Sequence, residues 1–113
     1  MNGNFGKMNL DKMMQQAQKM QAEMLKIQGE VAARTVEAMA GGGMVKVTAN
    51  GGGEVTAIEI APAAADPEDV EMLQDMVLAA VNEALRQGKE MMAAEMAQLT
   101  GGLGLPGMKL PGF

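Results

Sequence analysis

The chain has 113 residues, which suits one domain with a modest core. It contains no Cys and no His, so it offers no thiolate nucleophile, disulfide, thiolate zinc site or imidazole base. Its net charge of -5, with two Phe as the only aromatic residues, argues against simple affinity for nucleic acid over the whole surface.

The N-terminal residues carry no targeting signal. Residues 1–8 are polar and rich in Gly and Asn, without the apolar segment of a signal peptide. No stretch approaches the roughly 20 apolar residues that span a bilayer. We therefore expect a cytoplasmic protein with no membrane partner.

The charges are unevenly distributed along the chain. Residues 1–36 carry five basic and three acidic residues, a net charge of +2. Residues 54–75 carry seven acidic residues and no basic one, a net charge of −7, and the rest balances to zero. A mildly basic N-terminal segment is thus joined to an acidic middle.

The N-terminal part predicts a long amphipathic helix over residues 9–40, after a flexible segment at residues 1–8. Asn9 is a good N-cap, and Gly41–Gly43 stops the helix. Apolar residues recur at alternating spacings of three and four, a heptad pattern typical of helix–helix contacts. They are Leu10, Met13, Ala17, Met20, Met24, Ile27 and Val31.

Residues 44–60 predict an antiparallel β-hairpin. Its turn contains Asn50 and Gly51–Gly53, and Asn-Gly between β-branched runs strongly favours a tight turn. No third strong strand is apparent, and a lone hairpin is marginally stable in water. We therefore expect a second copy of the chain to complete the sheet in a homodimer. The expected interface residues are Val45, Val47, Val55, Ile58 and Ile60.

A second long helix is predicted over residues 66–100. Asp66 stands at the cap position and Pro67 at the first helical position, and a broad apolar face follows. Residues 101–113 form a Gly- and Pro-rich tail that we expect to be flexible. Its other residues are mostly apolar, so it is expected to dock on the dimer or on a partner. The expected fold is α+β, with one domain over residues 1–113.

The sequence contains no convincing catalytic or cofactor site. Gly41–Gly43 and Gly51–Gly53 fit neither the phosphate-loop spacing nor the dinucleotide-binding fingerprint. The acidic residues between 66 and 75 are better explained as complements of a helix dipole than as a metal site. We expect no enzymatic activity, cofactor, metal or small-molecule substrate.

Three lysines recur every seven residues on the outward flank of the first helix. Lys12, Lys19 and Lys26 would lie about 10 Å apart, a spacing that a phosphate backbone could follow. The alternative is that they solvate a coiled coil. No aromatic residue lies among the basic ones, so stacking on single-stranded bases is not expected, and any binding would be to duplex backbone.

Several motifs occur in a specific order. They are a Met- and Gln-rich helix at 13–21, Gly-Gly-Met-Val-Lys-Val-Thr at 42–48, Asn-Gly-Gly-Gly-Glu-Val at 50–55, Asp-Pro-Glu-Asp-Val-Glu-Met-Leu at 66–73 and Leu-Thr-Gly-Gly-Leu-Gly-Leu-Pro-Gly at 99–107. Over essentially the whole chain, this order resembles the YbaB/EbfC family of small bacterial nucleoid-associated proteins. The resemblance implies a tweezer-like homodimer with helical arms that bind double-stranded DNA in the nucleoid. It also implies roles in nucleoid organisation, DNA protection and gene regulation, with other DNA-processing proteins as further candidate partners.

The resemblance implies that the helical arms make the DNA contacts. The positions that could do so here are Lys7, Lys12, Lys19, Lys26, Arg86 and Lys89. Glu83 and Glu90 lie beside the basic pair of the second helix, so we expect modest and salt-dependent affinity. The alternative function is a protein–protein adaptor that uses its Met-rich helices and apolar tail without binding DNA.

Overall fold

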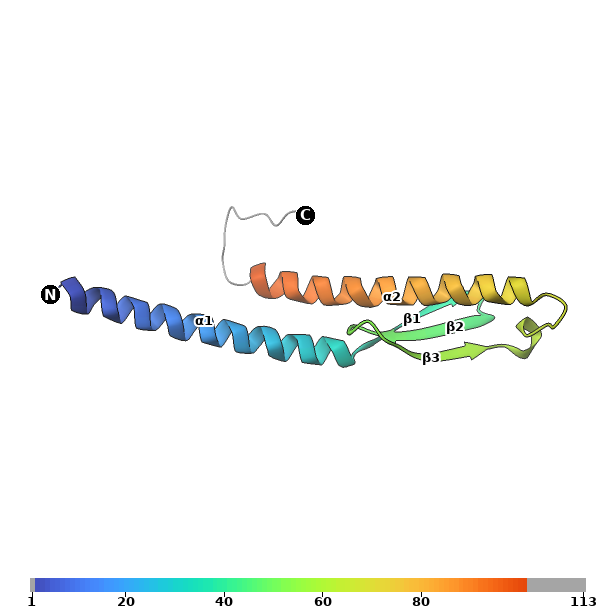
Figure 1. Ribbon diagram of the computed structural model, residues 1–113, viewed down its shortest axis with the longest axis horizontal. Coiled ribbons are helices and arrows are strands. Elements are labelled where there is room, and N and C mark those ends of the chain that lie inside the picture. The colour runs from blue at the N-terminus through green and yellow to red at the C-terminus, as the bar shows by residue number, and fades with distance from the viewer. Residues whose placement is uncertain (1, 102–113) are drawn as a thin grey trace.

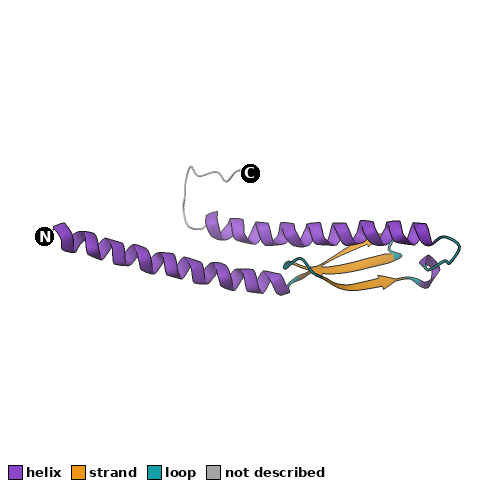
Figure 2. Ribbon diagram, in the orientation of Figure 1, coloured by secondary structure: helices purple, strands orange, loops and turns teal. Residues whose placement is uncertain are grey.

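The computed structural model describes residues 2–101, with the side chains of residues 9–99. The elements follow in the order α1 (Asn2–Ala33), β1 (Thr35–Ala40), β2 (Val45–Asn50), β3 (Val55–Ile60), a short 3₁₀ helix (Pro62–Ala64) and α2 (Val70–Gly101). They form an elongated molecule of 83 × 25 × 16 Å, in which α1 and α2 run in opposite directions (Figure 1). The sheet lies along α2, and α1 projects away from it (Figure 2). The predicted α+β class is confirmed.

The helix α1 begins and ends earlier than the sequence predicts. Its backbone is helical from Asn2, so most of the segment expected to be flexible belongs to the helix. At the other end the Arg34 N–H donates a hydrogen bond to the Val31 carbonyl at 3.0 Å and closes the last turn. The prediction of helix through residue 40 is therefore wrong, because the chain turns into a strand at Thr35.

The strand β1 is the element that the sequence analysis missed. It pairs antiparallel with β2, from Thr35 opposite Asn50 to Ala40 opposite Val45. Its Ala-Met-Ala ending has high helix propensity, and pairing with β2 overrides that preference. The sheet has the order β1-β2-β3 within one chain. The expectation that a second copy must complete the hairpin is therefore wrong.

The predicted hairpin is present as β2 and β3. The Asn50 side-chain oxygen accepts a hydrogen bond from the Glu54 N–H at 3.0 Å, which closes the turn. Gly53 has a φ of 88°, in the left-handed region that glycine tolerates without steric cost. A bulge between Thr48 and Ala49 then adds to the twist of the strands.

The core lies between α2 and the inner face of β1 and β2. Val45, Val47 and Ala49 alternate along β2 and are buried, and they belong to one cluster with Ala80 and Ala84 of α2. Val45 and Val47 have no exposed surface in the single chain. They therefore belong to the core of the protomer, which removes both from the expected dimer interface.

The strand β3 is an uncovered edge strand. All six of its residues are exposed, because α2 lies over β1 and β2 instead. Ile58 pairs with Val47 and Ile60 with Val45, so both isoleucines lie on the same face of the sheet as the core. That face is covered over two strands and open over the third.

The helix α2 begins later than predicted. The Asp66 side chain accepts a hydrogen bond from the Glu68 N–H at 2.9 Å and stabilises a turn outside the helix. Asp69 accepts one from the Met72 N–H at 3.2 Å and caps the helix that starts at Val70. The helix continues through Gly101, and the rest of the predicted tail, residues 102–113, lies outside the described residues.

Two glycines bring α1, the β2–β3 turn and α2 into backbone contact. A Cβ on Gly51 would collide with the Val31 carbonyl oxygen. A Cβ on Gly88 would lie 2.5 Å from the Asn50 carbonyl oxygen. The Gly51 N–H also donates a hydrogen bond to the Arg34 carbonyl at 3.0 Å. The base of α1 is thus fixed to the sheet and to α2 at positions where only glycine fits.

We expect Gly88→Ala to destabilise the protein, although Gly→Ala within a helix ordinarily stabilises it by about 1 kcal/mol. The added Cβ meets backbone rather than a flexible side chain, so overpacking should cost about 1–3 kcal/mol. Gly29→Ala is the matched control, because nothing lies within 4 Å of its added Cβ. Urea unfolding should show opposite shifts in midpoint for the two variants. A Gly88→Ala protein as stable as the wild type would contradict the tight contact.

Candidate nucleic-acid interface

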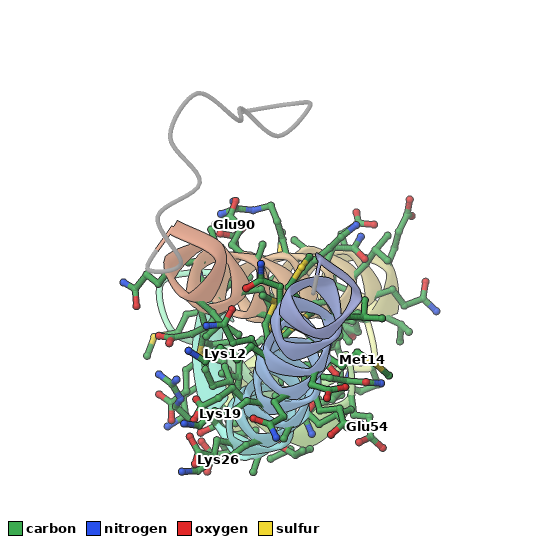
Figure 3. All side chains as sticks on the ribbon, turned by 90° about the vertical axis from the view of Figure 1, so that its left-hand side faces the viewer. Lys12, Met14, Lys19, Lys26, Glu54 and Glu90 are labelled. Atoms are coloured by element: carbon green, nitrogen blue, oxygen red, sulfur yellow. The ribbon has the colours of Figure 1, made fainter. Side chains whose placement is uncertain are left out.

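The helix α1 carries a row of three lysines. Lys12, Lys19 and Lys26 lie along one side of the helix, and Met14 lies on another (Figure 3). Successive lysines are seven residues apart, or about 10 Å, and all three are exposed. None of them forms an ion pair among residues 9–99. We call these three residues the lysine row.

Two glutamates lie beside the lysine row. Glu23 follows Lys19 by four residues, and Glu30 follows Lys26 by four. Residues four apart on a helix share a face, so these carboxylates reduce the positive potential along the row. Sequence reasoning missed this effect on α1, although counting acidic as well as basic residues on that face would find it.

Arg86 is held by two carboxylates on α2. Its Nε donates to Glu83 Oε2 at 2.9 Å, and its Nη1 donates to Glu90 Oε1 at 2.5 Å. Hydrogen bonds from Arg86, and then from Gln87, lower the pKa of Glu83 to about 2. The bond to Glu83 is also the main reason why the pKa of Arg86 is raised. A guanidinium already matched by two carboxylates attracts phosphate weakly, so Arg86 is a poorer candidate than the lysine row.

Lys89 lies on the body of the protein, near the base of α1. It lines a groove of about 520 Å³ together with Gly51–Gly53 and the α2 residues Leu85, Met92 and Ala93. Its side chain is exposed and forms no ion pair in the described part of the chain. Lys7 belongs to the helical backbone of α1, and its side chain lies outside those described.

Two further basic residues are paired with acids. Lys46 Nζ lies 3.2 Å from Glu59 Oε2 and 3.6 Å from Glu37 Oε1 on the outer face of the sheet. The hydrogen bond to Glu59, followed by the charge of Glu37, raises the pKa of Lys46. Arg34 lies 3.3 Å from Glu95 and ties the end of α1 to α2. Among the described side chains, the unpaired cations are therefore the lysine row and Lys89.

The acidic segment lies at the other end of the molecule. The connection before α2 and the first turns of that helix hold Asp66, Glu68, Asp69, Glu71 and Asp75. In Figure 1 this end lies opposite the N-terminus of α1. The long axis thus separates these five of the fourteen acidic residues from the lysine row.

The sequence of this chain matches a known protein family and individual relatives. Residues 6–103 match the YbaB/EbfC DNA-binding family. The chain belongs to that family. It is 61% identical over 100 residues to a nucleoid-associated protein of Pelotomaculum thermopropionicum, covering 88% of this chain and 95% of that protein. A nucleoid-associated protein of Moorella thermoacetica is 63% identical over 103 residues, covering 91% of this chain and 99% of that protein.

A solved structure shares the fold of this family member. The crystal structure of uncharacterized protein HP0035 from Helicobacter pylori matches with a TM-score of 0.58 at 24% sequence identity. The match covers 77% of this chain and 96% of that one. It supports the arrangement of two helices and a three-stranded sheet.

The described residues form neither a membrane-spanning helix nor a metal-binding cluster. Neither α1 nor α2 is apolar enough over a sufficient length to cross a membrane. No group of three or more acidic side chains within this part of the chain is arranged to hold a metal ion.

We expect the Glu83 carboxyl to titrate near pH 2, against an ordinary value of 4.5. A depressed pKa in the folded state means that Glu83 stabilises α2 above about pH 4.5, and that this contribution is lost as the pH falls through about 2. Carbon-detected NMR can follow this carboxyl directly. In Arg86→Gln the midpoint should return toward 4.5. An unchanged midpoint in that variant would contradict the pairing.

Proposed function

We propose that the chain forms a homodimer that binds double-stranded DNA through phosphate contacts from α1, without enzymatic activity. The observation that carries this proposal is the lysine row on a projecting helix, because its three cations are exposed and form no ion pair with the other side chains that the structure describes. Membership of a DNA-binding family supports it independently. The adaptor alternative has no comparable support.

The chemistry of α1 suits a duplex backbone rather than bases. The described part of α1 beyond Met8 has no aromatic residue on which a base could stack. Lysines spaced by about 10 Å can follow phosphates without reading a sequence. Binding of this kind is weakly specific and suits a protein that coats, organises and protects DNA in the nucleoid. Effects on gene regulation and contacts with other DNA-processing proteins would follow from that placement.

An apolar surface beside β3 supports the homodimer. Val55, Ile58 and Ile60 are 37%, 46% and 41% exposed. Ile60 also lines a groove of about 410 Å³ with α2 residues that include Leu73, Val77 and Leu78. We call Val55, Ile58, Ile60 and this groove the β3 surface. An open strand edge beside exposed apolar side chains is a typical site of association, and a twofold axis would let it contact itself.

Dimerisation would strengthen a weak DNA contact. One chain offers three lysines in the row, with two glutamates beside them. Two arms held on one body act at a high effective concentration, so their contacts reinforce each other. In this proposal the β3 surface assembles the dimer, and the two α1 helices hold the duplex.

Salt dependence tests the electrostatic proposal. If the dimer neutralises about six phosphates, log K should fall against log salt with a slope near −5. Lys19→Gln should lower the affinity and reduce the slope by about 2, because each copy loses one phosphate contact. Lys46→Gln is the matched control, since its cation lies on the sheet and is already paired. A slope near zero for the wild type would contradict the proposal.

Glu23→Gln should strengthen DNA binding. This carboxylate lies beside the lysine row, and its removal relieves repulsion from phosphate. Glu71→Gln removes one negative charge at the far end of the molecule and serves as the control. At low salt we expect a several-fold gain for the first variant and little change for the second. Equal affinities for the two variants would place the DNA elsewhere.

Ile58→Asp should dissolve the dimer while preserving the fold. The side chain is 46% exposed in the protomer, so a carboxylate there remains hydrated in the monomer. In the dimer it would be buried without a partner, which should weaken association at least tenfold. Ala57→Asp is the control, because Ala57 is exposed and pairs with Thr48 on the outer face. Analytical ultracentrifugation distinguishes the two, and a fully dimeric Ile58→Asp protein would overturn the assignment.

A further inference from the structure

The helix α1 carries an apolar face that is increasingly exposed toward its N-terminus. Val31 is fully buried at the base and Ile27 is half-buried. Further out, Met24 and Met20 are 36% and 37% exposed, and Met13 is 65% exposed. These residues belong to the heptad pattern, so they share one side of the helix. We call the outer part of this side, Leu10, Met13, Ala17, Met20 and Met24, the arm seam.

The position of α2 explains this gradient. It runs antiparallel to α1 and packs beside its base, where Arg34 and Glu95 form an ion pair. It ends at Gly101, and α1 continues beyond that point (Figure 1). The seam is thus covered where α2 lies beside α1 and exposed where α2 has ended.

The sequence that follows α2 has the chemistry to continue this cover. Residues 102–113 contain five large apolar side chains: Leu103, Leu105, Met108, Leu110 and Phe113. Gly and Pro alternate with them, so the segment cannot extend α2 as a regular helix. A purely solvated segment would be polar rather than apolar.

The length of this segment also fits the arm seam. The C-terminal end of α2, at Gly101, points along the molecule toward the N-terminus of α1 (Figure 1). Twelve residues in extended conformation span up to about 40 Å. The distance along α1 from Met24 to Leu10 is about 21 Å. The segment can therefore run along the whole seam, with slack to leave the end of α2.

We propose that residues 102–113 bind the arm seam of the same chain. The segment covers the apolar side of α1 that α2 leaves open, and it links the outer part of the helix to the end of α2. The lysine row lies about 140° around α1 from the seam, so it stays accessible with the segment in place. This contact requires no DNA, and its test is independent of the proposed function.

Engineered cysteine pairs test the contact in the full chain, which has no native Cys. We expect Met13→Cys with Leu105→Cys to form an intrachain disulfide at least tenfold faster than Gln15→Cys with Leu105→Cys under mild oxidation. Gln15 is also exposed, but it lies about 160° around the same helical turn. Equal rates for the two pairs would overturn the proposal. A predominantly interchain disulfide would also overturn it, because the occupant would then be a second copy.

Oxidation of methionine by hydrogen peroxide gives a second readout without added cysteines. A full-length variant with Leu103→Ser, Leu105→Ser and Leu110→Ser should lose the contact while α2 is kept. Mass spectrometry should then show several-fold faster oxidation of Met13 and Met20. Met72 is 57% exposed near the start of α2, so its rate should not change and it serves as an internal control. Unchanged oxidation rates at Met13 and Met20 would contradict the proposed contact between residues 102–113 and the arm seam.

Discussion

The close approach of α2 to β2 is the constraint on which the rest of the structure depends. Ala80 and Ala84 lie against the buried valines of β2, and Gly88 reaches the backbone at Asn50. Small residues along one side of α2 permit this spacing, because larger ones would lift the helix off the sheet. The same contact brings the β2–β3 turn against the end of α1. The direction in which α1 projects therefore depends on backbone contacts of the β2–β3 turn, which meets α2 at Gly88 and the end of α1 at Val31 and Arg34.

The elongated shape makes the proposed site for a polyanion compatible with an acidic chain. The net charge is -5, yet five of the fourteen acidic residues cluster before and at the start of α2, and the lysine row lies on the opposite part of the molecule. With a molecule 83 Å long and a Debye length of about 8 Å at physiological salt, charges at one end are screened from the other. Local potential along α1 matters more than net charge. Glu23 and Glu30 therefore lower the electrostatic potential at the proposed interface more than the distant acidic segment does.

The sequence correctly predicts those helices and strands that have strong local signals. It does not predict the elements and boundaries that depend on tertiary contacts. The hairpin follows from Asn50 and its glycines, and the two long helices follow from apolar periodicity. The sequence predicts a helix through residue 40 because Gly41–Gly43 provides the stop signal, whereas pairing with β2 makes Thr35–Ala40 a strand. Asp66 and Asp69 are both capping residues, and only the hydrogen bonds distinguish the turn from the helix start. Val45 and Val47 have the pattern of an interface, but the side of β2 that α2 covers cannot be deduced from alternation alone.

In the candidate site too, some features follow from the local sequence pattern and others depend on tertiary contacts. The lysine row depends on helical periodicity alone and was predictable, whereas the pairing of Arg86 and the position of Lys89 depend on side-chain geometry. The outer part of α1 poses a physical problem, because helices in proteins gain most of their stability from packing an apolar face, and here Leu10, Met13 and Met20 of that face are exposed. Phosphates would stabilise the lysine row, and the segment after α2 would cover the arm seam. These two contacts lie on different sides of α1. In our proposals, residues 102–113 stabilise the helix in the absence of DNA, and the lysine row on the other side remains free to bind phosphates.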